Sequence, residues 1–249
     1  MNEAENPQPI PPRSSGELTP ANPWNNRPND ADMQQVYETS YRLARSMVRE
    51  KAAEYAAEHD ELTNLLKRKA LLEHIDNCLS HQQPGDIYAL VFVDADNFKA
   101  VNDTHPGKHQ EGDAVLRAIA GLLQKDVRQE NTLWGILSTE KTRNDEVARL
   151  GGDEFVIFLQ LASHNDPPSP SSNLTPEERL ERFIARQQTN FQRFIDNRPD
   201  LADLPYPLGL SMGALIAEPG QTGEELLHRA DQEMQKMKAD HHEQGGSYR

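Results

Sequence analysis

Apolar residues gather in a few short runs along the chain, and polar stretches separate these runs. The most apolar run, IYALVFV at residues 87–93, is apolar on both faces, as a strand covered by helices on both sides should be. Elsewhere, apolar positions recur at the two-residue period of a strand or the 3.6-residue period of a helix. The pattern predicts a helix over 68–81, a strand over 87–93, a helix over 111–125, a hairpin over 147–161, a helix over 176–196, a strand over 208–217 and a helix over 223–240.

The order of these elements indicates the fold class. Strands that alternate with helices, with one hairpin inserted, are typical of an α/β sandwich of the βαββαβ kind. Two stretches, at about 126–144 and 163–176, are polar and lack a clear period, and we interpret them as loop insertions. The folded domain is expected to extend over residues 60–245.

The first 59 residues have a different composition. Residues 1–30 contain seven prolines and little that could be buried, which predicts a disordered leader. Residues 31–59 contain neither Pro nor Gly, and apolar residues recur there at helical spacing. These residues are Ala44, Val48, Ala52, Tyr55 and Ala56.

The role of this N-terminal helix stays open at the level of sequence. Its heptad pattern is weak, because Glu50 and Lys51 fall where the seam of a coiled coil requires apolar groups. The helix is therefore either a solvated lead-in that packs on its own domain or a signalling helix that pairs with a second copy.

Composition and charge exclude several classes of protein. The chain has 249 residues, of which 36% are hydrophobic, and its mean hydropathy is −0.80, so part of it is expected to lie outside a packed core. The formal net charge of −14 argues against nucleic acid as a partner. An anionic substrate would need metal ions or a few local Lys and Arg side chains.

The sequence also predicts the cellular compartment. A single cysteine, Cys78, rules out an intrachain disulfide and a cysteine-based zinc site, and it suits a reducing cytosol. No apolar run approaches the ~20 residues of a transmembrane helix, and the acidic, Pro-rich N-terminus is unlike a signal peptide. We therefore expect a cytoplasmic protein without a membrane segment.

Acidic residues gather at the turn of the predicted hairpin. In RLGGDEFVIF (149–158), Gly151 and Gly152 supply the positive φ angles of a tight turn, and Asp153 and Glu154 follow directly. Any exposed hairpin could carry such a turn.

A second acidic stretch, VFVDADNFKAVND (91–103), follows the apolar strand. Asp94 and Asp96 leave the strand on the same side, at the end where α/β folds place ligands. An acidic, solvated loop would have the same composition. If this strand and the hairpin are neighbours, however, Asp94 and Asp153 converge, and two carboxylates with backbone carbonyls suit Mg²⁺.

RLGGDEFVIF resembles the signature of the GGDEF family, the bacterial diguanylate cyclases. Five further segments resemble family motifs and follow in family order. They are DELTNLLKRKAL (60–71), DADNFKAVND (94–103), HQEGDAVL (109–116), LSMGALIA (210–217) and LLHRADQEMQKMK (226–238). The resemblance covers about 60–242 and implies a ferredoxin-like, palm-type nucleotidyl cyclase fold with a central, mainly antiparallel sheet, preceded here by the N-terminal helix.

The resemblance implies a reaction and a set of site residues. A homodimer of half-sites would join two GTP molecules into cyclic di-GMP and two pyrophosphates, with two Mg²⁺ ions per half-site and Mn²⁺ as an alternative. The implied metal ligands are Asp94, Asp153, Glu154 and the carbonyl of Ala95. The implied catalytic residues are Asp153, which would help to deprotonate a 3′-hydroxyl, Glu154 and Lys99. The implied substrate-binding residues are Phe98, Asn102, His109, Asp113, Gly151, Gly152 and Lys238.

Two of these residues would select the base. Asn102 and Asp113 would read the guanine edge, because a carboxylate accepts from guanine N1–H and N2–H, whereas adenine lacks this pair of donors. Lys99, with the amides of residues 95–98, would hold the β- and γ-phosphates. His109 is identified as the family's histidine because HxxGD is intact behind it, and His105 is its competitor in a segment two residues longer than usual.

Several positions depart from the family pattern. Lys67 stands where Asn is usual, Gln235 where Tyr is usual, and His242 where Arg is usual. Since the arginine would be a permanent, bidentate phosphate donor, its replacement by His242 is expected to affect turnover more than binding. The alternative function is therefore a degenerate domain that binds GTP or cyclic di-GMP as a sensor or scaffold, and a cyclase with another cyclic product would share the same site.

The product-inhibition site of the family is an RxxD motif, and its counterpart here is incomplete. Counting back from Gly151 places its aspartate at Asp145, but Thr142 occupies the arginine position. Arg143 is out of register by one residue, and Arg128 could serve if 131–144 loops out. Arg128 and Asp145 are the candidate pair, and exposed loop charges are the plainer interpretation.

Overall fold

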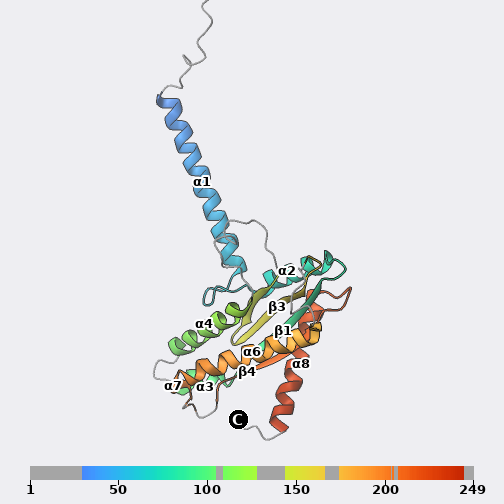
Figure 1. Cartoon of the computed structure of the whole chain (residues 1–249). Coiled ribbons are helices and arrows are strands. Elements are labelled where there is room, and N and C mark those ends of the chain that lie inside the picture. The colour runs from blue at the N-terminus through green and yellow to red at the C-terminus, as the bar shows by residue number, and fades with distance from the viewer. Residues whose placement is uncertain are drawn as a thin grey trace, which may run out of the picture. The chain divides into compact units, whose positions relative to one another are not determined.

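The computed structural model describes residues 30–104, 109–127, 144–165, 174–202, 204 and 207–243. The chain forms two units, the first ending at Lys51 and the second beginning at Ala52. The described elements are α1 (Asp30–Glu58), α2 (Arg68–Ser80), β1 (Ile87–Asp96), α3 (Phe98–Thr104), α4 (His109–Asp126), β2 (Glu146–Gly151), β3 (Glu154–Ala162), α6 (Pro176–Asp196), α7 (Pro199–Ala202), β4 (Gly209–Ile216) and α8 (Gly223–Glu243), as Figure 1 shows.

The described strands form one four-stranded sheet in the order β2-β3-β1-β4. Every pair of neighbours is antiparallel, and β1 lies between β3 and β4. The predicted α/β sandwich with a central, mainly antiparallel sheet is thus confirmed. Because β1 and β3 are neighbours, the condition for bringing Asp94 near the hairpin turn is met.

Side chains of β1 alternate between two cores, as the pleat of a strand requires. Val91 and Val93 pack on one face with residues of α4 and α6. Leu90 and Phe92 pack on the other face with residues of α2 and α8. Figure 1 shows helices covering both faces of the sheet. This double burial explains why the sequence of β1 is apolar without alternation.

Three features of the fold differ from the predicted elements. Strand β1 continues to Asp96, beyond the predicted end at 93, because Asp94 and Asp96 still pair with Ser211 and Gly209 of β4. A pattern of apolar residues cannot identify those strand residues that carry carboxylates. The short helices α3 and α7 were not predicted, since one or two turns are too few to show a period.

Some predicted segments lie partly outside the described residues. They are the Pro-rich leader at 1–30 and the loop insertions at about 126–144 and 163–176. Within the ranges that the structure does describe, no helix is both long and apolar enough to cross a membrane.

Helix α1 carries large apolar side chains that remain exposed. Their relative exposures run from 37% at Met33 to 69% at Val48. Eight of the nine exposed large apolar residues found in the described ranges belong to this helix. They are Met33, Val36, Tyr37, Tyr41, Leu43, Met47, Val48 and Tyr55.

Candidate active site

The end of β1 meets the turn of the β2–β3 hairpin at one edge of the sheet. Asp94 and Glu154 are partners in the β1–β3 register, and the Ala95 N–H donates to the Asp153 carbonyl at 3.2 Å. Burial and the charge of Asp94 raise the pKa of Asp153. Desolvation and the charges of Asp94 and Asp153 likewise raise the pKa of Glu154. The structure therefore brings together the acidic residues that the sequence predicted.

The hairpin turn is held in place by an arginine. Gly152 has a φ of 51°, a conformation that glycine adopts without steric cost. The Arg149 guanidinium donates to the Gly152 carbonyl from Nε at 3.0 Å and from Nη2 at 2.8 Å. Its Nη1 donates to Oδ1 of Asp60 at 2.9 Å. Asp60 and Arg149 thus form a brace beneath the turn that presents Asp153.

Asp60 is itself fixed by its own loop. Its Oδ1 accepts from the backbone N–H of Thr63 at 2.9 Å and from the Thr63 hydroxyl at 2.7 Å. Partial burial alone would raise the pKa of Asp60, but these hydrogen bonds and Arg149 lower it. The segment DELT was identified in the sequence as a family landmark without a role, and the structure assigns it this structural one.

A lysine from the last helix enters the acidic cluster. Nζ of Lys238 donates to Oδ1 of Asp94 at 2.5 Å and lies 3.4 Å from Oδ1 of Asp96. Burial lowers the pKa of Lys238, but its bonds with Asp94 and Asp96 outweigh burial and raise it overall. A protonated ammonium group therefore stands beside the predicted metal-binding carboxylates.

Helix α8 reaches this position because of a glycine in β4. A Cβ at Gly213 would lie 2.1 Å from the Met234 nitrogen and 2.5 Å from the Ala230 carbonyl oxygen. No side chain fits there, so the backbone of α8 packs directly on β4. This close approach explains the glycine of LSMGALIA and positions Lys238 over the end of β1.

Asp96 belongs to the charged cluster, although the sequence analysis gave it no role. Its two oxygens lie 2.7 and 2.8 Å from the Ser211 hydroxyl. A Cβ at Gly209 would lie 3.0 Å from Oδ2 of Asp96. The serine of LSMGALIA was the signal that could have identified this partner.

Five of the predicted nucleotide-binding residues lie on α3 and α4, which follow β1, and make up the nucleotide-binding group. Asn97, with a φ of 59°, joins the end of β1 to the start of α3. A Cβ at Gly112 would lie 2.2 Å from Oδ1 of Asn102 and 3.2 Å from Cζ of Phe98. A larger residue where α3 meets the first turn of α4 would therefore displace the Asn102 side chain. The members of the group are Phe98, Lys99 and Asn102 on α3, and His109 and Asp113 on α4.

Several other predicted residues cannot be placed within the part of the chain that the structure describes. Arg128 and His105 lie outside the described residues, and so does the side chain of His242. Asp145 accepts a hydrogen bond from the backbone N–H of Gln160 at 2.6 Å. The arginine–aspartate pair expected at a product-inhibition site therefore stays a prediction.

Gln235 occupies the position where the family usually has tyrosine. Its Nε2 lies 3.1 Å from both carboxylate oxygens of Asp231. Both residues line a cavity of about 480 Å³, together with Glu154, Arg68 and His228. The cavity thus joins this part of α8 to the acidic turn.

The carboxylates at the end of β1 suit Mg²⁺ only together with other ligands. No three His, Cys, Asp or Glu side chains converge into a metal cage within the described ranges. Mg²⁺ is usually bound by one or two carboxylates together with waters and substrate phosphates. A divalent cation would also relieve the repulsion by which Asp94 raises the pKa of Asp153. The site therefore fits a metal shared with a phosphate ligand better than one held by protein alone.

Comparison with protein families identifies the family of this chain. Residues 57–244 match the family described as diguanylate cyclase, GGDEF domain. The chain belongs to the GGDEF family. The family resemblance predicted from RLGGDEFVIF is thereby confirmed.

Curated relatives of this GGDEF chain are longer proteins. The diguanylate cyclase DgcP of Pseudomonas aeruginosa is 32% identical over 181 residues, which cover 72% of this chain and 22% of that protein. The uncharacterized protein Rv1354c of Mycobacterium tuberculosis is 34% identical over 179 residues, covering 72% of this chain and 23% of that protein. The chain thus spans less than a quarter of the length of these relatives.

Solved structures show the same GGDEF fold. The coiled coil and GGDEF domain of DgcB from Caulobacter crescentus, solved with c-di-GMP, gives a TM-score of 0.59 at 20% identity and covers 87% of this chain and 96% of that one. A sensory box/GGDEF family protein from the same organism gives a TM-score of 0.51 at 27% identity and covers 74% of this chain and 99% of that one. The first likeness concerns the fold alone.

Proposed function

We propose that this GGDEF chain is a diguanylate cyclase, which condenses two GTP molecules into cyclic di-GMP and two pyrophosphates. The observation that carries the proposal is that Asp94, Asp153 and Lys238 lie together at the end of β1. Helix α3, which carries part of the nucleotide-binding group, follows directly after β1. Membership of the family supports the same reaction. A reaction that consumes GTP belongs to the cytoplasm, which we propose as its location.

The metal-binding residues in this proposal are Asp94, Asp153, Glu154 and the carbonyl of Ala95. When bound there, two Mg²⁺ ions per half-site, or Mn²⁺ ions, would supply Lewis-acid chemistry at the attacking 3′-oxygen and at the α-phosphate. Asp153 would accept the proton of the 3′-hydroxyl. The 3′-oxygen of one GTP bonds to the α-phosphorus of the other, and the bond to the β-phosphate breaks to release pyrophosphate.

The remaining residues would bind and orient GTP. Lys238 and Lys99 are cations that can neutralise the triphosphate, and the turn at Gly151 and Gly152 allows close approach of the backbone. A phosphate that binds Lys238 would compete with Asp94 for the ammonium group. Phe98 and His109 would complete the pocket at the start of α3 and α4.

Asn102 and Asp113 would select guanine. An ionised Asp113 can accept from both N1–H and N2–H, and a base without these donors would leave the carboxylate unpaired at a cost of about 1–3 kcal/mol. The contact of Asn102 with the turn that carries Gly112 brings the two residues to adjacent parts of α3 and α4. This arrangement supports GTP over ATP as the substrate.

The reaction would require two copies of the chain, because each half-site would bind one GTP. We propose that the exposed apolar face of α1 provides the contact between copies. A partner helix would bury the large side chains from Met33 to Val48, which otherwise stay in water. Lys51, within the same stripe, would weaken the pairing and leave it open to regulation.

Gln235 favours a second candidate function. It replaces the usual tyrosine, and its amide pairs with Asp231 on its own helix. If this change, together with His242, prevents turnover, the domain would bind GTP or cyclic di-GMP as a sensor or scaffold.

Chromatography of reaction products separates the two functions. The full chain is incubated with GTP and Mg²⁺ beside an Asp153→Ala variant. We expect cyclic di-GMP from the natural chain and a rate lower by about 100-fold or more from the variant. A natural chain that binds GTP but forms no product at high protein concentration would contradict the cyclase proposal and support the sensor.

A further inference from the structure

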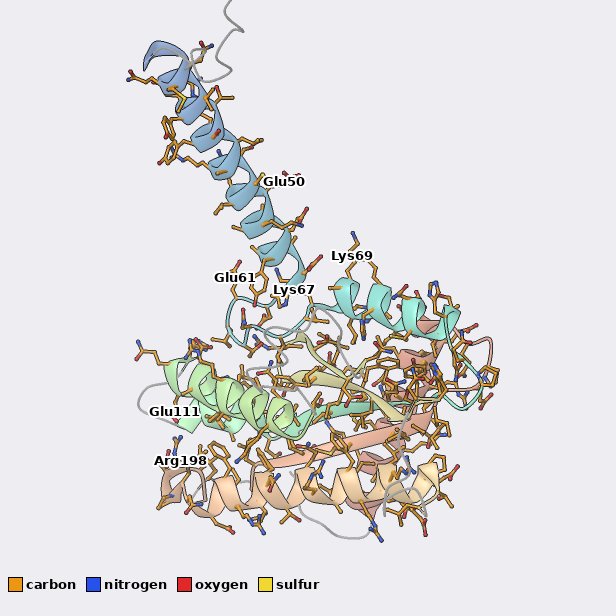
Figure 2. The ribbon with its side chains drawn as sticks, turned by 45° about the horizontal axis from the view of Figure 1, so that its top comes forward. Glu50, Glu61, Lys67, Lys69, Glu111 and Arg198 are labelled. Atoms are coloured by element: carbon orange, nitrogen blue, oxygen red, sulfur yellow. The ribbon has the colours of Figure 1, made fainter. Side chains whose placement is uncertain are left out.

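An arginine outside the predicted site residues is bonded to the first turn of α4. Arg198, between α6 and α7, donates from Nη2 to Oε1 of Glu111. Figure 2 shows the two residues facing each other from separate elements. Their side chains are only 32% and 22% exposed. The contact joins parts of the chain that are 87 residues apart in sequence.

Hydrogen bonds other than the one to Glu111 also fix the position of Arg198. Its Nε and Nη2 donate to Asp200, at 2.9 Å to Oδ1 and 2.5 Å to Oδ2. Its backbone N–H donates to the Ile195 carbonyl, and its carbonyl accepts from the N–H of Leu201, which is fully buried. The bonds to Asp200 and Glu111 raise the pKa of the guanidinium. A planar, permanently charged fork suits this two-carboxylate arrangement, which lysine could not reproduce.

Glu111 directly precedes Gly112 and Asp113, and Asp113 is one of the two residues that are predicted to bind the base. The next residue, Gly112, leaves no room for a Cβ against Asn102. Asp113 follows, and all three residues lie within the first turns of α4. Because the backbone of a helix moves as a hydrogen-bonded unit, holding Glu111 also holds Asp113 relative to Asn102.

We propose that Arg198 is a positioning residue for guanine recognition, because its ion pair with Glu111 fixes the turn of α4 that carries Asp113. This inference rests on the proposed binding of guanine by Asn102 and Asp113. Arg198 itself does not contact the base.

Inosine and guanosine nucleotides provide the readout. The hypoxanthine base lacks the 2-amino group of guanine, so it offers Asp113 one donor instead of two. Displacement of Asp113 therefore weakens binding of guanine more than binding of hypoxanthine. A general loss of stability would weaken both equally.

The experiment measures binding without turnover. The full chain is titrated calorimetrically with α,β-methylene GTP and with α,β-methylene ITP in the presence of Mg²⁺, because the methylene bridge prevents release of pyrophosphate. The variants are Arg198→Met, Glu111→Gln and the double variant. Arg182→Met, an exposed arginine of α6, is the matched control.

We expect Arg198→Met and Glu111→Gln each to weaken binding of the GTP analogue by about tenfold, as for loss of one hydrogen bond to a charged group, and the ITP analogue by much less. The double variant should be no weaker than either single variant, since both remove the same ion pair. Arg182→Met should retain the natural preference. Thermal unfolding confirms that each variant is folded, and Glu111→Gln retains the test if Arg198→Met does not fold.

Failure of the positioning role and failure of the proposed guanine site give different results. If the natural chain prefers the GTP analogue and both single variants keep that preference, or if their effects add in the double variant, the positioning role is overturned. If the natural chain itself shows no preference, the proposed guanine site is overturned, and the role of Arg198 with it.

Discussion

At the scale of single residues, Arg149 connects the entry of the domain to the acidic turn. Replacing it with methionine would remove the bonds to Asp60 and to the Gly152 carbonyl. We expect Arg149→Met to lower the free energy of unfolding by about 1–3 kcal/mol, because Asp60 loses its charged partner. Turnover should fall further than stability explains, since the turn that carries Asp153 is no longer fixed. Urea unfolding and GTP turnover check this, and unchanged turnover in the folded variant would contradict the brace.

A second residue-scale prediction concerns acid stability. Asp86 is almost fully buried and accepts from the backbone N–H groups of Gln83 and His164 and from the ring of His164. Burial alone would raise the pKa of Asp86, but these bonds lower it below the usual 3.8. Because the folded pKa is the lower one, the stabilisation is complete above the unfolded pKa and is lost as pH falls through the folded pKa.

Asp86→Asn should therefore be less stable than the natural chain at neutral pH, and its stability should change less with pH in the acid range. Melting temperatures measured between pH 6 and pH 3 test this. Glu181→Gln, at an exposed position of α6, is the control. Parallel pH curves for Asp86→Asn and the natural chain would refute the assignment.

At the scale of elements, apolar periodicity predicts the long helices and the central strand, because burial determines where these begin and end. It does not predict α3 or the end of β1, where carboxylates replace apolar residues within a paired strand. The acidic pair at Asp94 and Asp153 could be predicted from the acidic stretch that ends the apolar strand and from the acidic hairpin turn. The brace at Arg149 and the ion pair of Arg198 could not, because each depends on tertiary contacts between distant segments.

At the scale of the whole molecule, charge and assembly determine whether the site can act. The net charge of −14 repels a nucleoside triphosphate at long range. Local cations such as Lys238, and metal ions bound with the substrate, must therefore supply the attraction. Binding would then depend on Mg²⁺, and two loaded copies, both strongly acidic, would approach each other only if a separate contact holds them.

The exposed face of α1 is our candidate for that contact, and a charge placed on it tests the assembly. Val48 is 69% exposed in the single chain, and an aspartate there would be buried without a partner in a paired helix. We expect Val48→Asp to be monomeric by light scattering and to lose cyclic di-GMP synthesis, while binding of α,β-methylene GTP is retained. Arg49→Asp introduces the same charge at a neighbouring exposed position on the polar side of the helix, and it should leave the dimer intact. A dimeric Val48→Asp variant with full turnover would place the contact between copies elsewhere. A monomeric variant that still binds the nucleotide analogue would show that the half-site forms within one chain and that α1 serves to bring in the second copy.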